Sequence, residues 1–207
     1  MSVSSRSPVN GDHARFAHSR YLVRAKLLRI FGGAFHIHDP EGELVLYTEQ
    51  KRFRIKEDIR LYTDESMRRE LLRISTQSVF DIAGAYDVQD SVNGERVGTL
   101  KRSGLTSTFL RDHWELLDGE GSVVGELHED STLKALVRRL VDVAALLLPQ
   151  RYHLTMGERT VANFHQRFNP LILKLEVDFS PDTGGRLDRR LGLAAAVLVS
   201  AIEGRQQ

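Results

Sequence analysis

The chain repeats one sequence pattern, and this repetition limits the folds that are open to it. Two short runs of alternating apolar and polar residues are joined by a turn rich in Gly, Asp, Asn or Pro, which is the signature of a β-hairpin. Five copies span residues 35–49, 58–75, 86–102, 114–130 and 152–168. Further alternating runs at 21–30 and 171–179 bring the predicted number of strands to about twelve.

Antiparallel strands in this number need protection for their edges, and a closed barrel removes the edges altogether. Side chains alone fill a barrel of about eight strands, so a barrel of about twelve leaves an interior that something else must occupy. We therefore expect a mainly β protein, in which a closed antiparallel barrel of about twelve strands encloses an apolar element.

The enclosed element is predicted near the end of the sequence, at residues 187–204. This segment contains a nearly uncharged run, Leu191–Ile202, whose apolar residues cover every side of a helix. A helix that is apolar all round must be buried all round. Asp188 is suited to the N-cap of this helix and Gly204 to its end. The run is shorter than the roughly 20 residues of a membrane-spanning helix, so no integral membrane span is predicted.

One more helix is predicted over residues 131–148, which Pro149 ends. Its apolar residues fall on one face, so we place it outside the barrel as a crossover between the fourth and fifth hairpins. A helix lying on a membrane surface is the alternative. Residues 1–19 contain few apolar side chains and predict a disordered N-terminal tail. Residues 20–204 then form a single barrel domain.

Composition excludes several kinds of site. The chain has no cysteine, which rules out disulfides, thiol nucleophiles and Cys-based zinc or iron–sulfur centres. A formal net charge of +1 gives no overall attraction to nucleic acid, and no nucleic-acid partner is expected. The sequence contains no nucleophile elbow, P-loop or dinucleotide fingerprint, and no cofactor is expected. The N-terminal residues lack the apolar core of a signal peptide, so a cytoplasmic location is expected.

The motifs FHIHDPEGELVLY, IRLYTDESMRRELLRI, VGTLKR and WELLDGEGSVVGELHEDS, followed by the apolar helix, occur in one order over residues 20–204. In this order they resemble the LURP-one-related proteins and the phospholipid scramblases of the tubby-like superfamily. The resemblance implies a closed barrel threaded by its C-terminal helix. Tubby proteins are associated with phosphoinositides, but no matching basic motif can be carried over. Scramblases are associated with a cysteine cluster and a Pro-rich N-terminus, which this chain lacks.

A basic run after the first hairpin is the first candidate site. In an extended chain Arg52, Arg54 and Lys56 share the outward face. Such a row suits lipid phosphates, at roughly 1 kcal/mol per charge near an anionic surface. Further basic residues that could join this surface are Arg24, Lys26, Arg68 and Arg69. The alternative is a solvated face with no binding role, because Glu57 and Asp58 partly neutralise the row.

A second candidate is the pair His36 and His38, which places two imidazoles on the same side of a strand, a spacing that zinc sites use. A third ligand would have to come from another hairpin. The histidines that could supply it are His113, His128, His153 and His165. The simpler interpretation is two solvent-facing histidines, and no metal is predicted.

These observations favour a non-enzymatic barrel that acts as a binding or scaffold module. Its expected partner is an anionic phospholipid surface or a protein, at a location that is cytoplasmic and peripheral to a membrane. Two alternatives stay open. One is a scramblase-like membrane protein, which would need the terminal helix to leave the barrel. The other is a metal-dependent hydrolase built on His36 and His38.

Overall fold

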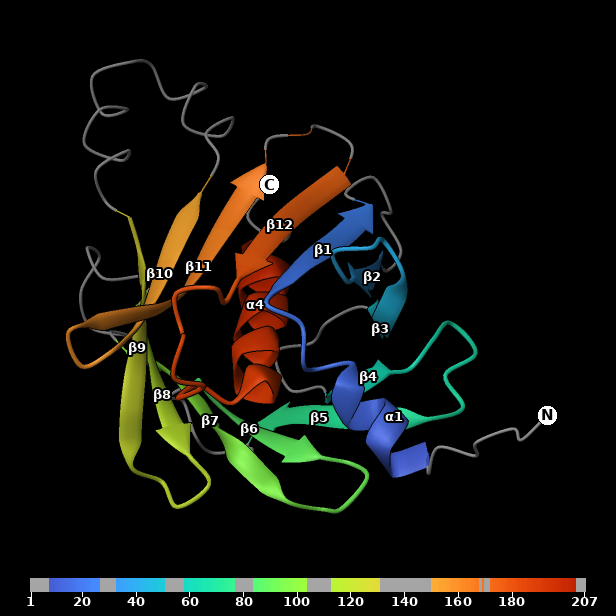
Figure 1. Cartoon of the computed structure of the whole chain (residues 1–207), viewed down its shortest axis with the longest axis horizontal. Coiled ribbons are helices and arrows are strands. Elements are labelled where there is room, and N and C mark those ends of the chain that lie inside the picture. Colours follow the sequence, from blue (N-terminus) through green and yellow to red (C-terminus); the bar gives the residue numbers. More distant parts are fainter. Residues whose placement is uncertain are drawn as a thin grey trace.

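The structure is a computed structural model, and it describes residues 8–26, 33–50, 58–76, 84–103, 113–130, 150–167, 169 and 172–203. Its twelve antiparallel strands form a closed barrel, and a C-terminal helix passes through the middle of the ring (Figure 1). The predicted fold class, a mainly β closed barrel with a C-terminal helix, is confirmed.

The strands are joined in the order in which they occur in the chain. They are β1 (Arg20–Lys26), β2 (Gly33–His38), β3 (Leu44–Gln50), β4 (Ile59–Tyr62), β5 (Glu70–Thr76), β6 (Ala85–Asp90), β7 (Arg96–Ser103), β8 (His113–Asp118), β9 (Val123–Glu129), β10 (Arg151–Met156), β11 (Arg159–Arg167) and β12 (Ile172–Asp178). Each strand pairs with its sequence neighbours, and β1 pairs with β12 to close the ring. The five predicted hairpins are β2–β3, β4–β5, β6–β7, β8–β9 and β10–β11.

Alternate residues of each strand face the inside of the barrel, as the period of two requires. The inward side chains are almost completely buried, among them Ile37 of β2, Leu100 of β7 and Phe164 of β11. Their outward neighbours, such as His36, are half-buried. The barrel therefore has an apolar inner surface and carries its polar chemistry on the outer face.

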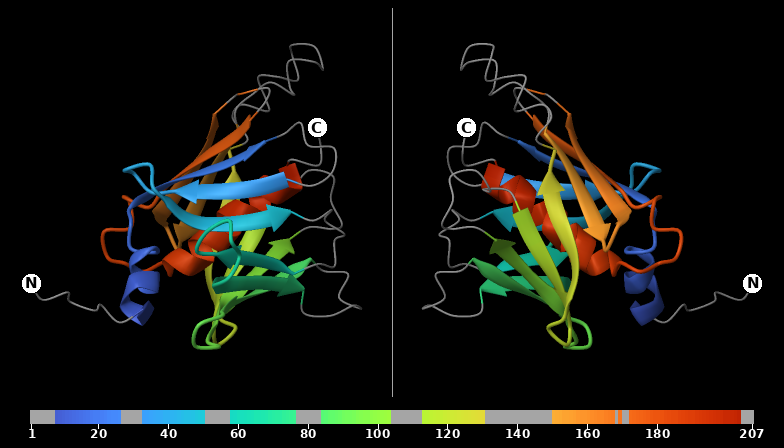
Figure 2. Two further views of the ribbon diagram at one scale, coloured as in Figure 1. Left: turned by 90° about the vertical axis from the view of Figure 1, so that its right-hand side faces the viewer. Right: turned by 90° about the vertical axis from the view of Figure 1, so that its left-hand side faces the viewer.

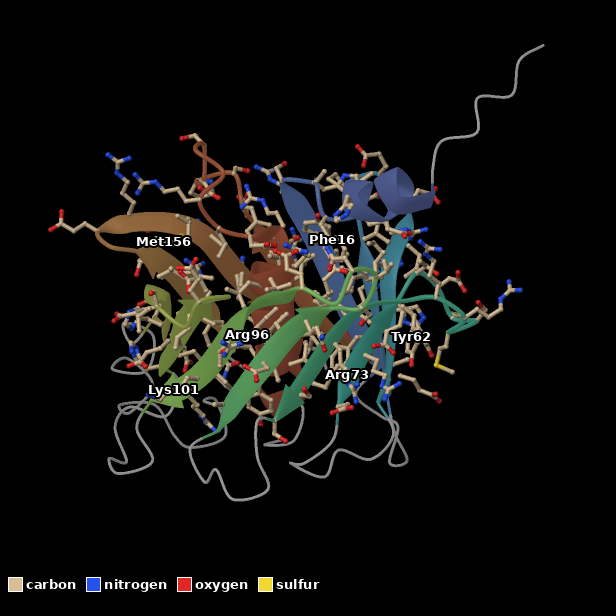
Figure 3. The ribbon with its side chains drawn as sticks, turned by 90° about the horizontal axis from the view of Figure 1, so that it is seen from below. Phe16, Tyr62, Arg73, Arg96, Lys101 and Met156 are labelled. Atoms are coloured by element: carbon tan, nitrogen blue, oxygen red, sulfur yellow. The ribbon has the colours of Figure 1, made fainter. Side chains whose placement is uncertain are left out.

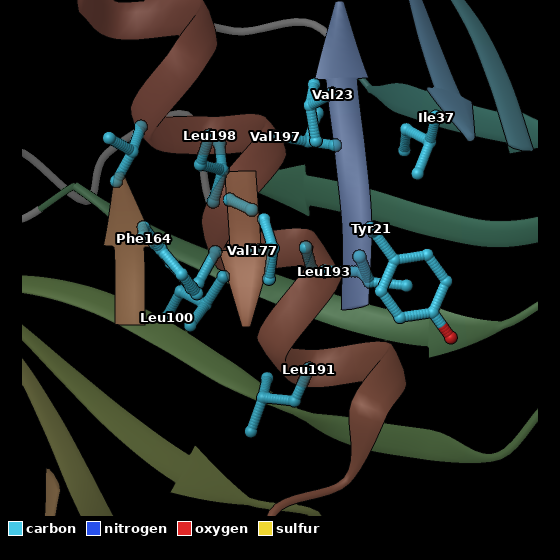
Figure 4. Packing of buried hydrophobic residues seen from close by; sticks show 14 of the residues in the cluster. Tyr21, Val23, Ile37, Leu100, Phe164, Val177, Leu191, Leu193, Val197 and Leu198 are labelled. Carbon is cyan, nitrogen blue, oxygen red and sulfur yellow. The ribbon is translucent and has the colours of Figure 1, made fainter. Parts of the chain in front are cut away.

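Helix α4 (Arg189–Glu203) fills the space inside the ring. Two side views show strands on either side of it (Figure 2). Leu193, Ala196 and Val197 have no exposed surface, and they belong to one buried cluster with strand residues that include Val23 and Val177 (Figure 4). Small residues on several sides keep the helix narrow enough to fit inside the barrel. Its surface is apolar all round, which suits burial on all sides.

The turn before α4 is held by two carboxylates. The Asp182 side chain accepts hydrogen bonds from the backbone N–H groups of Arg186 (2.9 Å) and Leu187 (3.1 Å). Asp188 caps the helix as predicted, since its Oδ1 accepts the backbone N–H of Arg190 at 2.9 Å. These bonds satisfy backbone donors that would otherwise lack partners at the helix start.

Gly192 of α4 lies where no larger residue fits, and this gives a first prediction. A Cβ at this position would stand 2.6 Å from Cε1 of Phe179, whose side chain is buried and has little room to move. We expect Gly192→Ala to lower the free energy of unfolding by about 1–3 kcal/mol. Glycine to alanine in an open helix normally stabilises by up to about 1 kcal/mol.

Gly11 provides the matched control, because a Cβ there would have no atom within 4 Å. Gly11→Ala, in the helix α1 (Pro8–Ala14), should leave stability unchanged or raise it slightly. Urea unfolding of both variants measures the difference. Equal stability changes would contradict the close packing of Gly192 against Phe179.

The predicted disordered tail over residues 1–19 is wrong from Pro8 onward, because this part of the chain folds against the barrel. After α1, the side chain of Phe16 is buried at the edge of the core (Figure 3). Arg15 Nη1 donates a hydrogen bond to the carbonyl oxygen of Val45 in β3 at 2.9 Å. The second predicted helix, 131–148, lies outside the described residues.

Polar contacts help to hold this N-terminal segment, which explains why its composition did not predict that it is ordered. Asp12 of α1 is buried and forms an ion pair with Arg69, which precedes β5. The Tyr21 hydroxyl donates to the carbonyl oxygen of Arg15 at 3.0 Å. Burial raises the pKa of Tyr21 to about 12. Among the described side chains, these polar contacts together with the buried Phe16 therefore fix the N-terminal segment.

Candidate functional site

A pocket of about 440 Å³ opens on the outer face of the barrel across β1, β2 and β3. Arg24, His36, His38 and Tyr47 line it, together with Glu65 from the turn between β4 and β5. Strand pairing places three of these in one row, because Arg24 is opposite His36 and His36 is opposite Tyr47. Residues that are far apart in the sequence thus meet in one concave surface.

His36 is held in place by two partners. Its Nε2 lies 2.7 Å from Glu65 Oε1, and its ring meets Tyr47 edge-on with the ring centroids 5.1 Å apart. A carboxylate can only accept, so this contact places a proton on Nε2 of His36. The Glu65 side chain reaches the pocket from the neighbouring hairpin and fixes the orientation of the imidazole.

His38 carries a buried nitrogen that lacks a partner. No described residue forms a hydrogen bond with its Nδ1. Burial lowers the pKa of His38 and the nearby guanidinium of Arg24 lowers it further; together they outweigh an interaction with the Leu22 backbone that raises it, so the ring is neutral at neutral pH. An unpaired buried nitrogen costs free energy, and in the tautomer with the proton on Nδ1 a hydrogen bond donated to a bound anion would remove this cost.

Arg24 supplies the positive charge of the pocket. It is exposed, and it stands opposite Lys174 of β12 in the pairing of β1 with β12. Within the described ranges neither Arg24 nor Lys174 forms an ion pair. Like charges on directly opposed residues repel each other, and an anion between them would relieve this repulsion. The pocket therefore suits a negatively charged group that can also bond to an imidazole.

The basic row predicted for lipid binding, Arg52, Arg54 and Lys56, lies outside the described residues and stays a prediction. The row begins two residues after Gln50, the end of β3, which is one of the pocket strands. Of the additional basic residues, Arg24 lines the pocket, whereas the Arg69 side chain is paired with α1. Arg68 donates instead to Ser66 Oγ at 3.2 Å.

His36 and His38 share one outer face as predicted, with nearly parallel rings whose centroids are 6.3 Å apart. Among the described side chains, no third ligand converges on this pair to complete a metal site. The four histidines that could have supplied one are on β8, β9, β10 and β11. Even β11 is separated from β2 by β1 and β12.

Tyr47 and Glu65 are pocket residues that the sequence did not reveal. Tyr47 faces His36 because the pairing of β2 with β3 shifts by one residue between Ile37 and His38. No signal in the sequence marks that shift. The contact from Glu65 depends on how two hairpins lie against each other, which local patterns do not encode.

In the part of the chain that the structure describes, no helix has both the length and the apolar character needed to cross a membrane. Among curated proteins no match to this chain is found. The family model described as LURP-one-related matches residues 44–199, from β3 into α4. This match covers more than half of the chain and most of the barrel with its central helix. The chain belongs to the LURP-one-related family.

Proposed function

We propose that the protein is a non-catalytic binding module that recognises a phosphate-bearing headgroup at the cytoplasmic surface of an anionic membrane. The observation that carries this proposal is the exposed Arg24 guanidinium beside Lys174, at a pocket that also holds the unpartnered Nδ1 of His38. Cationic and N–H donors together are the groups that bind phosphate oxygens in proteins.

The packing of the barrel supports a role at the outer surface. Buried side chains of α4 and the strands form one apolar cluster inside the ring. This interior stabilises the fold, whereas the described polar pocket lies outside it. Binding by a rigid barrel face requires no movement of the central helix, so the module can attach peripherally while its core stays intact.

The predicted basic row, which lies outside the described residues, would add to the attraction toward an anionic bilayer. Arg52, Arg54 and Lys56 follow β3 directly in the chain, and β3 contributes Tyr47 to the pocket. Each basic residue near an anionic bilayer contributes about 1 kcal/mol, and the attraction decays within the Debye length. A headgroup in the pocket and a basic row on the bilayer would then act together.

The test is binding of the intact protein to vesicles of phosphatidylcholine and phosphatidylserine, with vesicles of phosphatidylcholine alone as reference. Arg24→Glu changes the local charge by two, so we expect binding to weaken by about 2 kcal/mol, or roughly 30-fold. Reversing the charges of Arg52, Arg54 and Lys56 together should weaken vesicle binding further. Added salt should weaken binding of the unmodified protein.

Arg159→Glu is the matched control. Arg159 is an exposed arginine at the start of β11, away from the pocket, and the same charge change there should alter binding little. Equal losses for Arg24→Glu and Arg159→Glu would indicate a response to net charge and would overturn the pocket as the binding site. Binding that resists both salt and Arg24→Glu would overturn the proposal as a whole.

A further inference from the structure

A second cluster of ionisable side chains lies on β8 and β9, on another part of the outer face. His113 and His128 are directly opposite each other in the antiparallel pairing of these strands. Their Nδ1 atoms are 2.8 Å apart. On the other side of the second ring, His128 Nε2 lies 3.0 Å from Glu126 Oε2. Both histidines are half-buried, which limits the freedom of the two rings.

The hydrogen bonds determine where the protons are. Because the Glu126 carboxylate can only accept, His128 Nε2 carries a proton. In neutral His128 the Nδ1 atom therefore carries a lone pair and no proton, and this lone pair points at Nδ1 of His113. A single proton then lies between the two Nδ1 atoms. A metal ion could bind both nitrogens at this position, since neutral imidazole is a metal ligand.

We propose that His113 and His128 bind a divalent late transition-metal ion, such as Zn²⁺, through their Nδ1 atoms, with Glu126 holding the His128 ring in orientation. A carboxylate that accepts the second N–H of a ligating histidine is the usual support for such a ligand. Candidate ligand atoms of His113, His128 and Glu126 lie within 4.8 Å of one another, and Glu126 serves here as the acceptor of the His128 N–H rather than as a ligand. Water would complete the coordination.

The distances suit this ion. Two nitrogens at about 2.0–2.1 Å from a tetrahedral zinc ion stand roughly 3.3 Å apart. The observed Nδ1–Nδ1 distance of 2.8 Å therefore needs to open by only about 0.5 Å. Imidazole ligands favour zinc, copper and nickel over magnesium and calcium, which prefer sets of oxygen ligands. Ligands on paired strands also hold their spacing better than ligands on loops.

Two other histidine groups are not part of the proposed site. His153 of β10 is opposite His128, but its Nδ1 is 2.7 Å from Asn163 Oδ1 and its Nε2 is 3.9 Å from Asp130 Oδ2, and its nitrogens are not among the ligand atoms that converge with those of His113 and His128, so we do not count it as a ligand. A separate group joins His18 to two carboxylates, with contacts of 3.9 and 4.0 Å made by different ring nitrogens. Those longer contacts lack the convergent pair of nitrogens found at His113 and His128.

The experiment is calorimetric titration of the full chain, free of any affinity tag and stripped with a chelator, with Zn²⁺. We expect one equivalent to bind. His113→Gln and His128→Gln should each weaken binding by at least about 100-fold, and Glu126→Gln by about 10-fold. His165→Gln is the matched control, because it changes a half-buried outward histidine on β11 and should leave the affinity unchanged.

Circular dichroism and urea unfolding of each variant establish that the barrel is retained. A Co²⁺ titration of the unmodified chain gives a second readout, in which visible absorption bands should arise and should be absent from His128→Gln. Failure to take up stoichiometric Zn²⁺ would overturn the proposal. It would also be overturned if binding survived His113→Gln and His128→Gln, or was lost instead in His18→Gln.

Discussion

Truncation of the chain after Arg186 is expected to abolish cooperative unfolding. The deleted part includes Leu191, Leu193 and Val197 of α4, all of which are almost completely buried. Burial of each large apolar side chain contributes about 1.5–3 kcal/mol. The net stability of a whole domain is only about 5–15 kcal/mol. The strands would also face a void along the barrel, and a close-packed interior does not tolerate a void of that size.

Trp114, the only tryptophan in the chain, is buried on β8 and reports the transition by fluorescence. The truncated chain should unfold gradually in urea, whereas the full chain should show one sharp transition. Val197→Ala removes only a small part of the buried apolar surface of α4 and should lower the free energy of unfolding by about 2 kcal/mol. Val123→Ala removes the same methyl groups at a position that is 59% exposed, and should change stability by less than about 0.5 kcal/mol.

A truncated chain that remained cooperatively folded would contradict the filling role of α4. So would equal effects of Val197→Ala and Val123→Ala, because the two sites differ chiefly in burial, and the helix propensity of alanine partly offsets the loss only at Val197. The comparison thus separates the packing of the helix from general effects of shortening the chain.

The architecture could be predicted because two local patterns are strong. Alternation with a period of two marks each strand, and the apolar run Leu191–Ile202 has no polar face for solvent. Both patterns reflect burial of individual side chains, which a single sequence records directly. The helix Pro8–Ala14 escaped prediction because it is fixed by Arg15 and Asp12 through contacts with distant strands.

The outer sites could not be predicted because they depend on register. In the β8–β9 hairpin the pairing shifts by one residue between Leu116 and Leu117. Without that shift, counting outward from the pair Leu117–Val123 would place His113 opposite Leu127 instead of His128. A slip of one residue moves side chains to the other face of a sheet. The histidine pair therefore exists only because of a local irregularity that the hairpin pattern does not show.

Arg190→Met is expected to lower the free energy of unfolding by about 3–5 kcal/mol, because it leaves a buried carboxylate without its charged partner. Arg190 Nη1 lies 2.8 Å from Asp90 Oδ2 and 3.0 Å from Glu95 Oε2. The side chains of Arg190 and Asp90 are only 14% and 3% exposed. This ion pair joins the start of α4 to the β6–β7 hairpin.

Arg20→Met is the matched control for this substitution. The Arg20 side chain is 67% exposed, and its Nε lies 3.5 Å from Asp178 Oδ1. Loss of such a surface pair should cost no more than about 1 kcal/mol. Adding Asp90→Asn to Arg190→Met should recover part of the lost stability, because it removes the unpaired charge. If Arg190→Met cost no more than Arg20→Met, the Asp90 ion pair would not stabilise the fold.

The pH dependence identifies Asp90 as the origin of the effect. Burial raises the pKa of Asp90, but hydrogen bonds from Arg190 and from the backbone N–H groups of Val92 and Asn93 outweigh it and lower the pKa overall. A carboxyl whose pKa is lower when folded stabilises above its unfolded pKa of about 3.9, and this stability is lost as the pH falls through the folded value. The stability difference between the unmodified chain and Arg190→Met should therefore be largest near neutral pH and narrow below about pH 4. Urea unfolding across this pH range measures the difference in the free energy of unfolding. A difference that stays constant with pH would assign the stabilisation to the packing of the Arg190 side chain rather than to the charge of Asp90.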